Sequence, residues 1–249
     1  PDGSSIASEF VDYPEQYEDV GYGIGFGEPL PVEFVREGDA ANWHVPEGPV
    51  EGWTEAGFDD AGWSPAKTGI GFDKVGGLYE DQIGEGGNVR EAMRNVNASI
   101  FFRVPFQVDD PSGITEMTLR MKWEDGFVAY LNGVEIARRN APAPPMWNSG
   151  ASGFPTDAEA LEFEDIDVSD HRNLLSADSN LLAIHGLNFG AGSSDFLIVP
   201  ELRGASLTAG DSVALSATTQ VRARAFGDGE WSPLNQATFI VGAPPSQSN

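Results

Sequence analysis

One long loop holds the side chains of this chain best suited to recognising a sugar. Trp147 lies in a polar, proline-containing stretch, residues 144–149. It comes shortly after Arg138, Arg139 and Asn140. An indole ring can stack on the apolar face of a pyranose, while guanidinium and amide groups bond its acid or hydroxyl groups. These residues therefore predict a carbohydrate site, and the arginine pair would suit an anionic sugar.

The same loop residues also have an ordinary structural interpretation. Trp147 could fold back as a lid over the body of the protein. Arg138 and Arg139 are two of only 14 basic residues, whereas the chain has 39 acidic residues, so both arginines could pair with nearby carboxylates. The sequence favours pairing for the arginines and leaves the role of Trp147 open.

Four further residues are candidates for the same binding role. Trp53 and Tyr79 lie in the other large loops of the chain. Asn188 and Asp195 flank the loop before the last predicted strand of the main body. We expect this second pair to close one end of the fold, where exposed rings and convergent polar groups would meet.

The sequence does not indicate catalysis. The chain has no cysteine and three histidines, and His185 lies in an apolar stretch, where a structural role is the better interpretation. Neither a Gly-x-Ser-x-Gly elbow, nor a His-Glu-x-x-His helix, nor a phosphate-binding loop occurs. Carboxylate pairs are expected by chance among so many acids. We therefore predict a non-catalytic protein, and a glycan-active enzyme is the less favoured alternative.

The charge balance excludes several classes of partner. The formal net charge is −25, which disfavours nucleic acid and anionic membranes because both require clustered Lys and Arg. Apolar runs stay shorter than the roughly 18 residues of a membrane span. We expect an exported, solvated monomer. The start at Pro1 without Met suggests a piece cut from a larger precursor.

Strands joined by turns account for most of the chain. Residues 115–123 alternate apolar and polar side chains, and this period of two indicates a strand. The turn signals Glu124-Asp125-Gly126 and Asn132-Gly133 then predict two tight hairpins and a three-stranded meander. One short helix is expected near residues 89–96. The other predicted strands of the main body are residues 32–35, 99–106, 163–168, 181–187 and 196–202.

The pattern divides the chain into four segments. An acidic, glycine-rich arm, residues 1–30, is expected to pack its aromatic side chains on the body. The main β domain covers residues 31–203. A small β appendage follows at residues 204–242, and residues 243–249 begin a linker rich in Pro and Ser.

The main domain contains a series of motifs in a characteristic order. They are Phe58-Asp59-Asp60-x-x-Trp63, Thr68-Gly69-Ile70-Gly71-Phe72, Phe102-Arg103 with Phe106, residues 124–133, residues 138–142, Asn180-Leu181-Leu182-Ala183-Ile184-His185 and residues 193–197. Together these motifs resemble the galactose-binding-like jelly-roll domains that accompany bacterial glycoside hydrolases and surface proteins, and the resemblance covers about residues 30–202. The fuller pattern looks like a version common in exported multidomain proteins of planctomycete-type bacteria, and residues 221–232 look like the end of a chitobiase-type C-terminal repeat.

The resemblance implies an all-β, jelly-roll β-sandwich that binds carbohydrate and holds a structural Ca²⁺. By position, Asp59, Asp60 and Glu201 match the calcium ligands, although Asp59 and Asp60 could simply form a turn or cap. The expected role is an accessory module that tethers a larger secreted or cell-surface protein to a polysaccharide or cell-surface glycan. A structural or adhesion module that binds another protein domain is the alternative.

Overall fold

The computed structural model describes residues 29–74, 77–206, 219–223, 226–227, 230–231 and 234–239. The contacts of the chain define a compact unit, Gly27–Gly210, which contains the main β domain. Among the described residues, no helix is long and apolar enough to cross a membrane. The predicted arm and linker lie outside the described residues, except for the last two residues of the arm.

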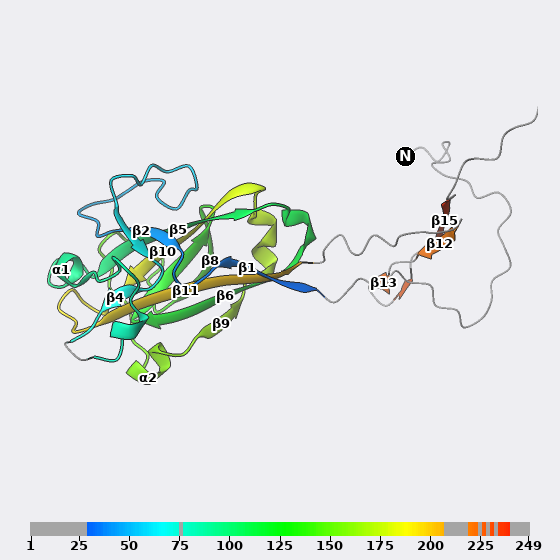
Figure 1. The fold of residues 1–249 in the computed structure, drawn as a ribbon. Coiled ribbons are helices and arrows are strands. Elements are labelled where there is room, and N and C mark those ends of the chain that lie inside the picture. The colour runs from blue at the N-terminus through cyan, green and yellow to red at the C-terminus, as the bar shows by residue number, and fades with distance from the viewer. Residues whose placement is uncertain are drawn as a thin grey trace, which may run out of the picture. The chain divides into compact units, whose positions relative to one another are not determined.

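The first layer of the main domain is a five-stranded antiparallel sheet (Figure 1). The strand order is β1-β11-β6-β9, and β4 pairs with the start of β11. The long strand β11 is central because β6 covers one of its edges, whereas β1 and β4 share the other. The strands are β1 (Leu30–Val35), β4 (Ile70–Phe72), β6 (Ile114–Glu124), β9 (Glu164–Asp167) and β11 (Phe196–Ser206).

The second layer is a six-stranded antiparallel sheet in the order β3-β2-β5-β10-β7-β8. Its central strand β10 is almost continuously buried, which fits a strand covered on both faces. The strands are β2 (Ala40–His44), β3 (Ser64–Lys67), β5 (Ser99–Val108), β7 (Gly126–Leu131), β8 (Val134–Arg139) and β10 (Asp178–Leu187).

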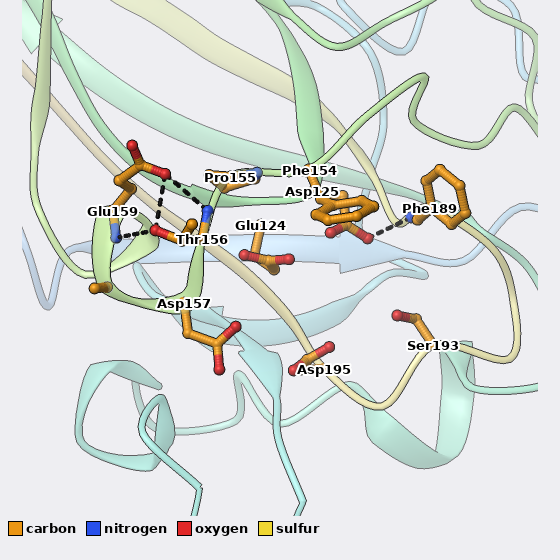
Figure 2. Close-up of a pocket in the computed structure, with 11 residues that line it drawn as sticks. Glu124, Asp125, Phe154, Pro155, Thr156, Asp157, Glu159, Phe189, Ser193 and Asp195 are labelled. Atoms are coloured by element: carbon orange, nitrogen blue, oxygen red, sulfur yellow. Dashed lines mark hydrogen bonds between the residues drawn. The ribbon is translucent and has the colours of Figure 1, made fainter.

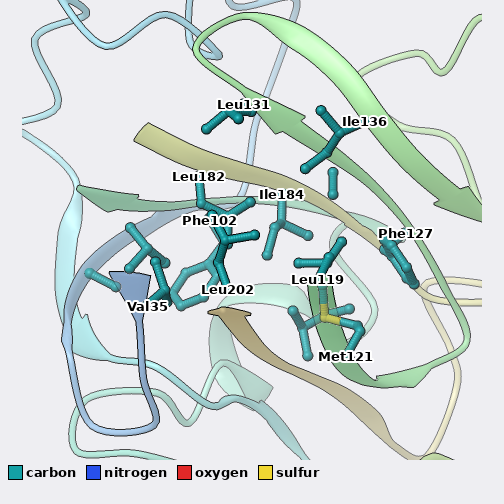
Figure 3. Packing of buried hydrophobic residues seen from close by; sticks show 14 of the residues in the cluster. Val35, Phe102, Leu119, Met121, Phe127, Leu131, Ile136, Leu182, Ile184 and Leu202 are labelled. Carbon is teal, nitrogen blue, oxygen red and sulfur yellow. The ribbon is translucent and has the colours of Figure 1, made fainter. Parts of the chain in front are cut away.

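The core lies between these two sheets (Figure 3). Alternate residues of β6, such as Leu119 and Met121, are fully buried and pack with Phe102 and Ile184 from the opposite sheet. Apolar side chains on the inner faces of the two sheets therefore supply the hydrophobic stabilisation of the sandwich, at about 25 cal/mol per Å² buried. The prediction of an all-β sandwich is confirmed.

The predicted three-stranded meander is wrong at its first turn. Strand β6 pairs with β11 and β9, whereas β7 pairs with β10 and β8, so residues 124–126 carry the chain from one sheet to the other. Gly126 is required there, because a Cβ atom would lie 2.9 Å from the carbonyl oxygen of Arg139. The second turn is a true hairpin, since Asn132 and Gly133 both have positive φ angles.

Helices are few and short. The predicted helix at residues 89–96 is reduced to a single turn, α1. In the C-terminal part of the chain, β12 pairs with β15 and β13 pairs with β14. The helices are η1 (Glu80–Gln82), α1 (Arg90–Met93), η2 (Pro111–Gly113), α2 (Asp157–Ala160) and η3 (Ser169–Leu174), and the C-terminal strands are β12 (Thr219–Ala223), β13 (Phe226–Gly227), β14 (Glu230–Trp231) and β15 (Asn235–Phe239).

Candidate functional site

A cavity of about 700 Å³ opens at one end of the sandwich, and we call it the acidic pocket (Figure 2). It lies where β6 and β10 end and β7 and β11 begin, with α2 on one side. Three connections supply its wall: the crossover from β6 to β7, the segment that ends in α2, and the loop between β10 and β11. The lining residues are Glu124, Asp125, Phe154, Pro155, Thr156, Asp157, Ala158, Glu159, Phe189, Ser193 and Asp195.

Two exposed aromatic rings border the acidic pocket. Phe154 is 65% exposed and Phe189 is 56% exposed, and they are the only aromatic side chains among the large exposed hydrophobic residues that the structure describes. Their ring centroids are 5.5 Å apart, and the rings are perpendicular at 89°. Exposed apolar rings of this size favour a site that binds a ligand with an apolar face.

Glu124 lies at the bottom of the acidic pocket. Its side chain is buried, with only 5% of the residue exposed, and the Tyr79 hydroxyl donates a hydrogen bond of 3.3 Å to its Oε2. Burial, together with the neighbouring carboxyl group of Asp125, raises the pKa of Glu124 to about 9. Glu124 therefore carries a proton at neutral pH, and its carboxyl group can donate as well as accept a hydrogen bond.

Like charges accumulate in the acidic pocket. Burial raises the pKa of Asp195, and the carboxylates of Asp73, Asp157 and Asp125 raise it further. Neither Lys nor Arg is among the residues that line the pocket. Figure 2 shows the carboxyl groups of Glu124, Asp157 and Asp195 around the same opening. The pocket therefore combines hydrogen-bond acceptors with a strongly negative potential.

Hydrogen bonds between side chains and the backbone hold the walls of the acidic pocket in place. Asp125 accepts from the backbone N–H of Phe189, and its own carbonyl oxygen accepts from the side-chain amide of Asn140 at 3.0 Å. The Asn188 amide donates to the carbonyl oxygen of Asp195 at 3.0 Å. On the other wall, Thr156 begins α2 with a capping box. Three of the predicted binding residues, Asn140, Asn188 and Asp195, thus lie at this end of the sandwich.

A second hollow of about 730 Å³ continues from the acidic pocket. The two cavities share four lining residues, Phe154, Pro155, Ala158 and Glu159. Trp123 and Phe163 add apolar surface to the second hollow, and Asn140 adds an amide. The two cavities together are large enough for more than one monosaccharide unit.

The predicted aromatic residues Trp53 and Trp147 lie together, but elsewhere. They line a hollow of about 290 Å³ on the outer face of the six-stranded sheet. Trp53 is 8% exposed and stacks on Phe101, with ring centroids 4.1 Å apart. Trp147 is half-buried, and its carbonyl oxygen accepts from the Asn97 amide at 3.3 Å. Trp147 is therefore folded back over the sheet, as the lid interpretation anticipated.

Tyr79 and the arginine pair have internal partners. Tyr79 is only 1% exposed, so its ring offers no face to a ligand. Its hydroxyl group donates a hydrogen bond to Glu124. Arg138 bonds Glu135 through two nitrogens, and Arg139 bonds Glu164 in the same way. The structure thus shows the pairing that the sequence favoured for the two arginines.

His185 is a structural residue, as predicted. Only 3% of it is exposed, and its Nε2 lies 2.8 Å from the Ser99 hydroxyl. Its ring packs edge-on against Phe101 at 4.9 Å. Burial lowers the pKa of His185 to about 3, so the ring is neutral at physiological pH.

Two of the three predicted calcium ligands belong to a loop on the six-stranded sheet. Asp59 forms a turn by accepting from the N–H of Ala61 at 3.1 Å, which is the ordinary role considered for it. Asp60 forms an ion pair of 2.7 Å with the buried Arg103. The guanidinium of Arg103 also donates to three carbonyl oxygens of this loop, so Asp60 serves to anchor the loop.

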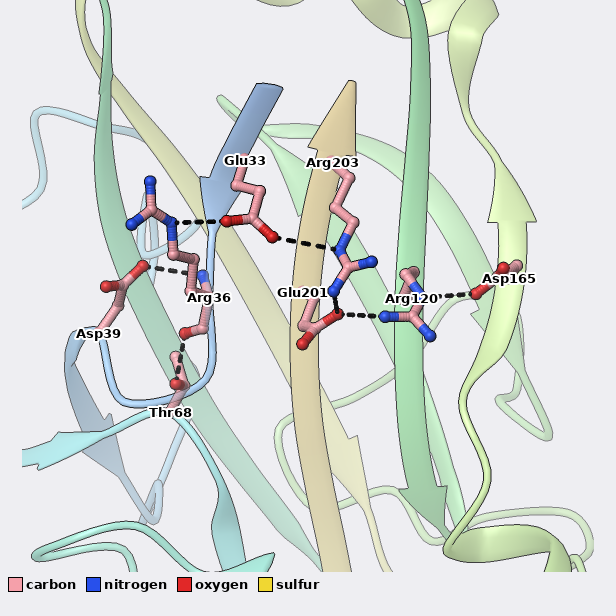
Figure 4. Close-up of polar contacts among 8 residues, drawn as sticks. All are labelled: Glu33, Arg36, Asp39, Thr68, Arg120, Asp165, Glu201 and Arg203. Atoms are coloured by element: carbon pink, nitrogen blue, oxygen red, sulfur yellow. Dashed lines mark hydrogen bonds and ion pairs between the residues drawn. The ribbon is translucent and has the colours of Figure 1, made fainter. Parts of the chain in front are cut away.

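The third predicted ligand, Glu201, lies on β11 of the five-stranded sheet (Figure 4). It points away from the core on β11 and forms ion pairs of 2.6 Å with Arg120 and 2.9 Å with Arg203. Glu201 and Asp60 therefore do not form one site. In the described part of the chain, no group of three or more His, Asp or Glu side chains is arranged to hold a metal ion. A calcium ion stays a prediction of the sequence.

The two aromatic residues of the acidic pocket are not predicted from the sequence. Phe154 and Phe189 lie in separate loops, and neither forms part of a motif. Glu124 and Asp125 were interpreted as an ordinary hairpin turn. The one available signal was a large aromatic residue next to Pro or Gly in each loop, Phe154-Pro155 and Phe189-Gly190, where a ring has no strand to pack on.

Fold and site together define a two-sheet β-sandwich domain with an acidic, aromatic-bordered cavity at one end. No protein-family model matches the chain, and no curated protein is significantly similar to it. Among solved structures it is similar to a β-glucuronidase from Bacteroides uniformis, with 12% identity, a TM-score of 0.40, and coverage of 68% of this chain and 18% of that one.

Two further solved structures are similar at the same distant level. A β-glucuronidase from an uncultured Clostridium species has 11% identity and a TM-score of 0.42, over 89% of this chain and 35% of that one. The Bifidobacterium dentium β-glucuronidase complexed with coumarin-3-O-glucuronide has 20% identity and a TM-score of 0.36, over 70% of this chain and 21% of that one. The chain thus spans between 18% and 35% of the length of these proteins.

Proposed function

We propose that this domain is a non-catalytic carbohydrate-binding module that holds its ligand in the acidic pocket. The observation that carries the proposal is the pairing of exposed Phe154 and Phe189 with the carboxylates of Asp157 and Asp195 around one cavity. An aromatic ring covers the C–H face of a pyranose, and carboxylates accept hydrogen bonds from its hydroxyl groups. The pocket supplies both groups from loops that are tied to the sandwich by hydrogen bonds.

The proposed role in the organism follows from the sequence. We assign the domain to the galactose-binding-like jelly rolls of exported bacterial proteins, where it would tether a larger protein to a polysaccharide or a cell-surface glycan. The acidic surface suits a solvated, exported module. A protein-binding adhesion module is distinguished from this proposal by the glycan experiment below.

The burial of Glu124 supports binding rather than hydrolysis. A general acid must reach the glycosidic oxygen of its substrate, to within about 3 Å. Glu124 is only 5% exposed and its carboxyl group accepts a hydrogen bond from Tyr79, so little of this side chain is accessible to a substrate in the cavity that it lines. Its raised pKa is nevertheless the one feature that favours a glycan-active enzyme. Release of reducing sugar from a polysaccharide panel, lost in Glu124→Gln, would establish that alternative.

Affinity electrophoresis and a glycan array test the binding proposal. We expect retention on at least one polysaccharide, weakened by about tenfold or more in Phe154→Ala and in Phe189→Ala. Leu30→Ala is the matched control, because Leu30 is also exposed, at 51%, and does not line the pocket. Retention that is equal in all three variants, or absent on every glycan, contradicts the proposal.

A further inference from the structure

The charge of the acidic pocket restricts which sugars it can accept. Five of the lining residues are acidic, namely Glu124, Asp125, Asp157, Glu159 and Asp195, and none is basic. In the described part of the chain, these carboxyl groups take part in no ion pair with Lys or Arg. A sugar acid or sulfate would enter this field against repulsion.

Two arginines near the pocket have partners within the protein. Arg139 is bonded to Glu164 at the rim of the second hollow. Arg90 donates to the backbone carbonyl oxygen of Asp73 at 2.7 Å rather than to its carboxylate. The arginine pair that suited an anionic sugar in the sequence is thus unavailable, and the observed electrostatics select the opposite charge.

A positively charged ligand would neutralise part of the negative charge of the pocket. Burial raises the pKa of Asp195, the Ser194 hydroxyl that donates to its Oδ1 at 3.1 Å lowers it, and repulsion from the carboxylates of Asp73, Asp157 and Asp125 raises it further. A bound cation would relieve this repulsion. The faces of Phe154 and Phe189 also attract cations, since an aromatic ring carries a negative quadrupole on its face.

We propose that the ligand of the acidic pocket is a hexosamine unit with a free, protonated amino group. The inference rests on the proposed function and names the class of sugar. The ring carbons of the hexosamine pack against Phe154 and Phe189, its hydroxyl groups donate to carboxylates, and its ammonium group lies near Asp157 and Asp195. N-acetylation removes the charge, so the acetylated sugar loses this last interaction.

Calorimetric titration of the full chain with three short oligosaccharides tests the inference. They are a glucosamine oligomer, the N-acetylated oligomer of the same length, and an oligogalacturonate, all with EDTA present to exclude metal bridges. We expect the glucosamine oligomer to bind at least about tenfold more tightly than its acetylated form, and the uronate to bind least. Added salt should weaken binding of the glucosamine oligomer.

Variants assign the preference to the pocket. The double variant Asp157→Asn with Asp195→Asn keeps the shape of both side chains and should abolish the preference for the free amine. Asp109→Asn is the control, because Asp109 is exposed and lies outside the pocket.

A second control uses another cationic ligand. A chain of charge −25 attracts any polycation, so a lysine oligomer with the same charge as the glucosamine oligomer is titrated in parallel. Its binding should not depend on Phe154 or Phe189.

The outcomes separate this inference from the proposed function. Equal affinity for free and acetylated oligomers overturns the inference and leaves carbohydrate binding intact. If Phe154→Ala or Phe189→Ala also weakens binding of the lysine oligomer, the specificity for a sugar is overturned. The absence of binding to every oligosaccharide, with the variants folded, overturns both proposals.

Discussion

The carboxylate of Asp125 accepts a hydrogen bond from the backbone N–H of Phe189, across 64 residues of sequence. This bond joins the crossover between the two sheets to the loop between β10 and β11. It therefore connects the residue that turns the chain between the layers with one of the two exposed rings of the acidic pocket. The position of Phe189 depends on the architecture of the sandwich.

Replacing Asp125 should affect both stability and binding. Asp125→Ala leaves the N–H of Phe189 without its partner in a region where Asp125 itself is only 3% exposed. We expect a loss of roughly 1–3 kcal/mol in the free energy of unfolding, measured by urea denaturation. Glycan binding should weaken at a temperature where the variant is still folded. Asp109→Ala, an exposed carboxylate, should change neither quantity.

The sequence predicted the layers of this fold better than their connections. Alternation along β6 placed Leu119 and Met121 on one face, because side chains in a strand alternate and only one face of β6 is in the main core. The crossover at Glu124-Asp125-Gly126 was mistaken for a hairpin, since both features use the same local residue types. Which sheet the next strand joins depends on non-local pairing, here of β7 with β10.

The candidate site could be predicted only in part for a related reason. Asn188 and Asp195 were recognisable because they flank a loop at a strand end. Phe154 and Phe189 are separated by 35 residues, and only the tertiary fold brings their rings to 5.5 Å. Trp147 and Trp53 carried a stronger local signal, yet they pack on a sheet face, because large apolar rings are stabilised by burial wherever a surface is available.

Asp60 provides a test of the anchoring role against the calcium role. Asp60→Ala removes the carboxylate that pairs with Arg103, whose side chain is 3% exposed, and leaves a buried charge with only carbonyl partners. We expect a destabilisation of roughly 2–3 kcal/mol. The loss should be the same with and without EDTA, measured by thermal unfolding. If chelator abolished the difference between variant and parent, Asp60 would be a calcium ligand instead.

The raised pKa of Glu124 predicts a specific dependence of stability on pH. The group holds its proton in the folded state up to about pH 9, whereas the unfolded chain loses it near its ordinary value. Between these values the folded state binds more protons, so this group makes stability fall as pH rises. Glu124→Gln removes the titration and should flatten the curve between about pH 7 and pH 9.

This pH window avoids the opposite contribution of His185. Its pKa is lowered to about 3 in the folded protein, so its effect appears only as pH falls below the ordinary value of 6.5. Thermal unfolding of the parent, Glu124→Gln and the exposed control Glu37→Gln over the alkaline window makes the comparison. A slope in Glu124→Gln equal to that of the parent would show that Glu124 is ionised in the folded protein.

Arg139 should contribute little to stability or to binding. Its ion pair with Glu164 is partly exposed, with 36% of each side chain accessible, and such pairs contribute less than about 1 kcal/mol. Arg139→Ala should therefore leave the urea midpoint nearly unchanged. It should also not weaken the binding of any glycan, because the acidic pocket makes no use of this guanidinium. Loss of affinity for a uronate oligomer in this variant would restore the anionic-sugar hypothesis.

Trp147 tests whether the aromatic hollow on the six-stranded sheet is a binding site or a covering for the sheet. The ring is half-buried in a cluster with Trp53 and Phe101, so Trp147→Ala removes apolar packing from the sheet face. We expect a destabilisation of roughly 1–2 kcal/mol, less than for a fully buried Trp. Affinity for the glycan bound by the parent should stay within about twofold, because the acidic pocket is built from other loops. A stable Trp147→Ala variant that no longer binds glycan would instead place the sugar site at this hollow.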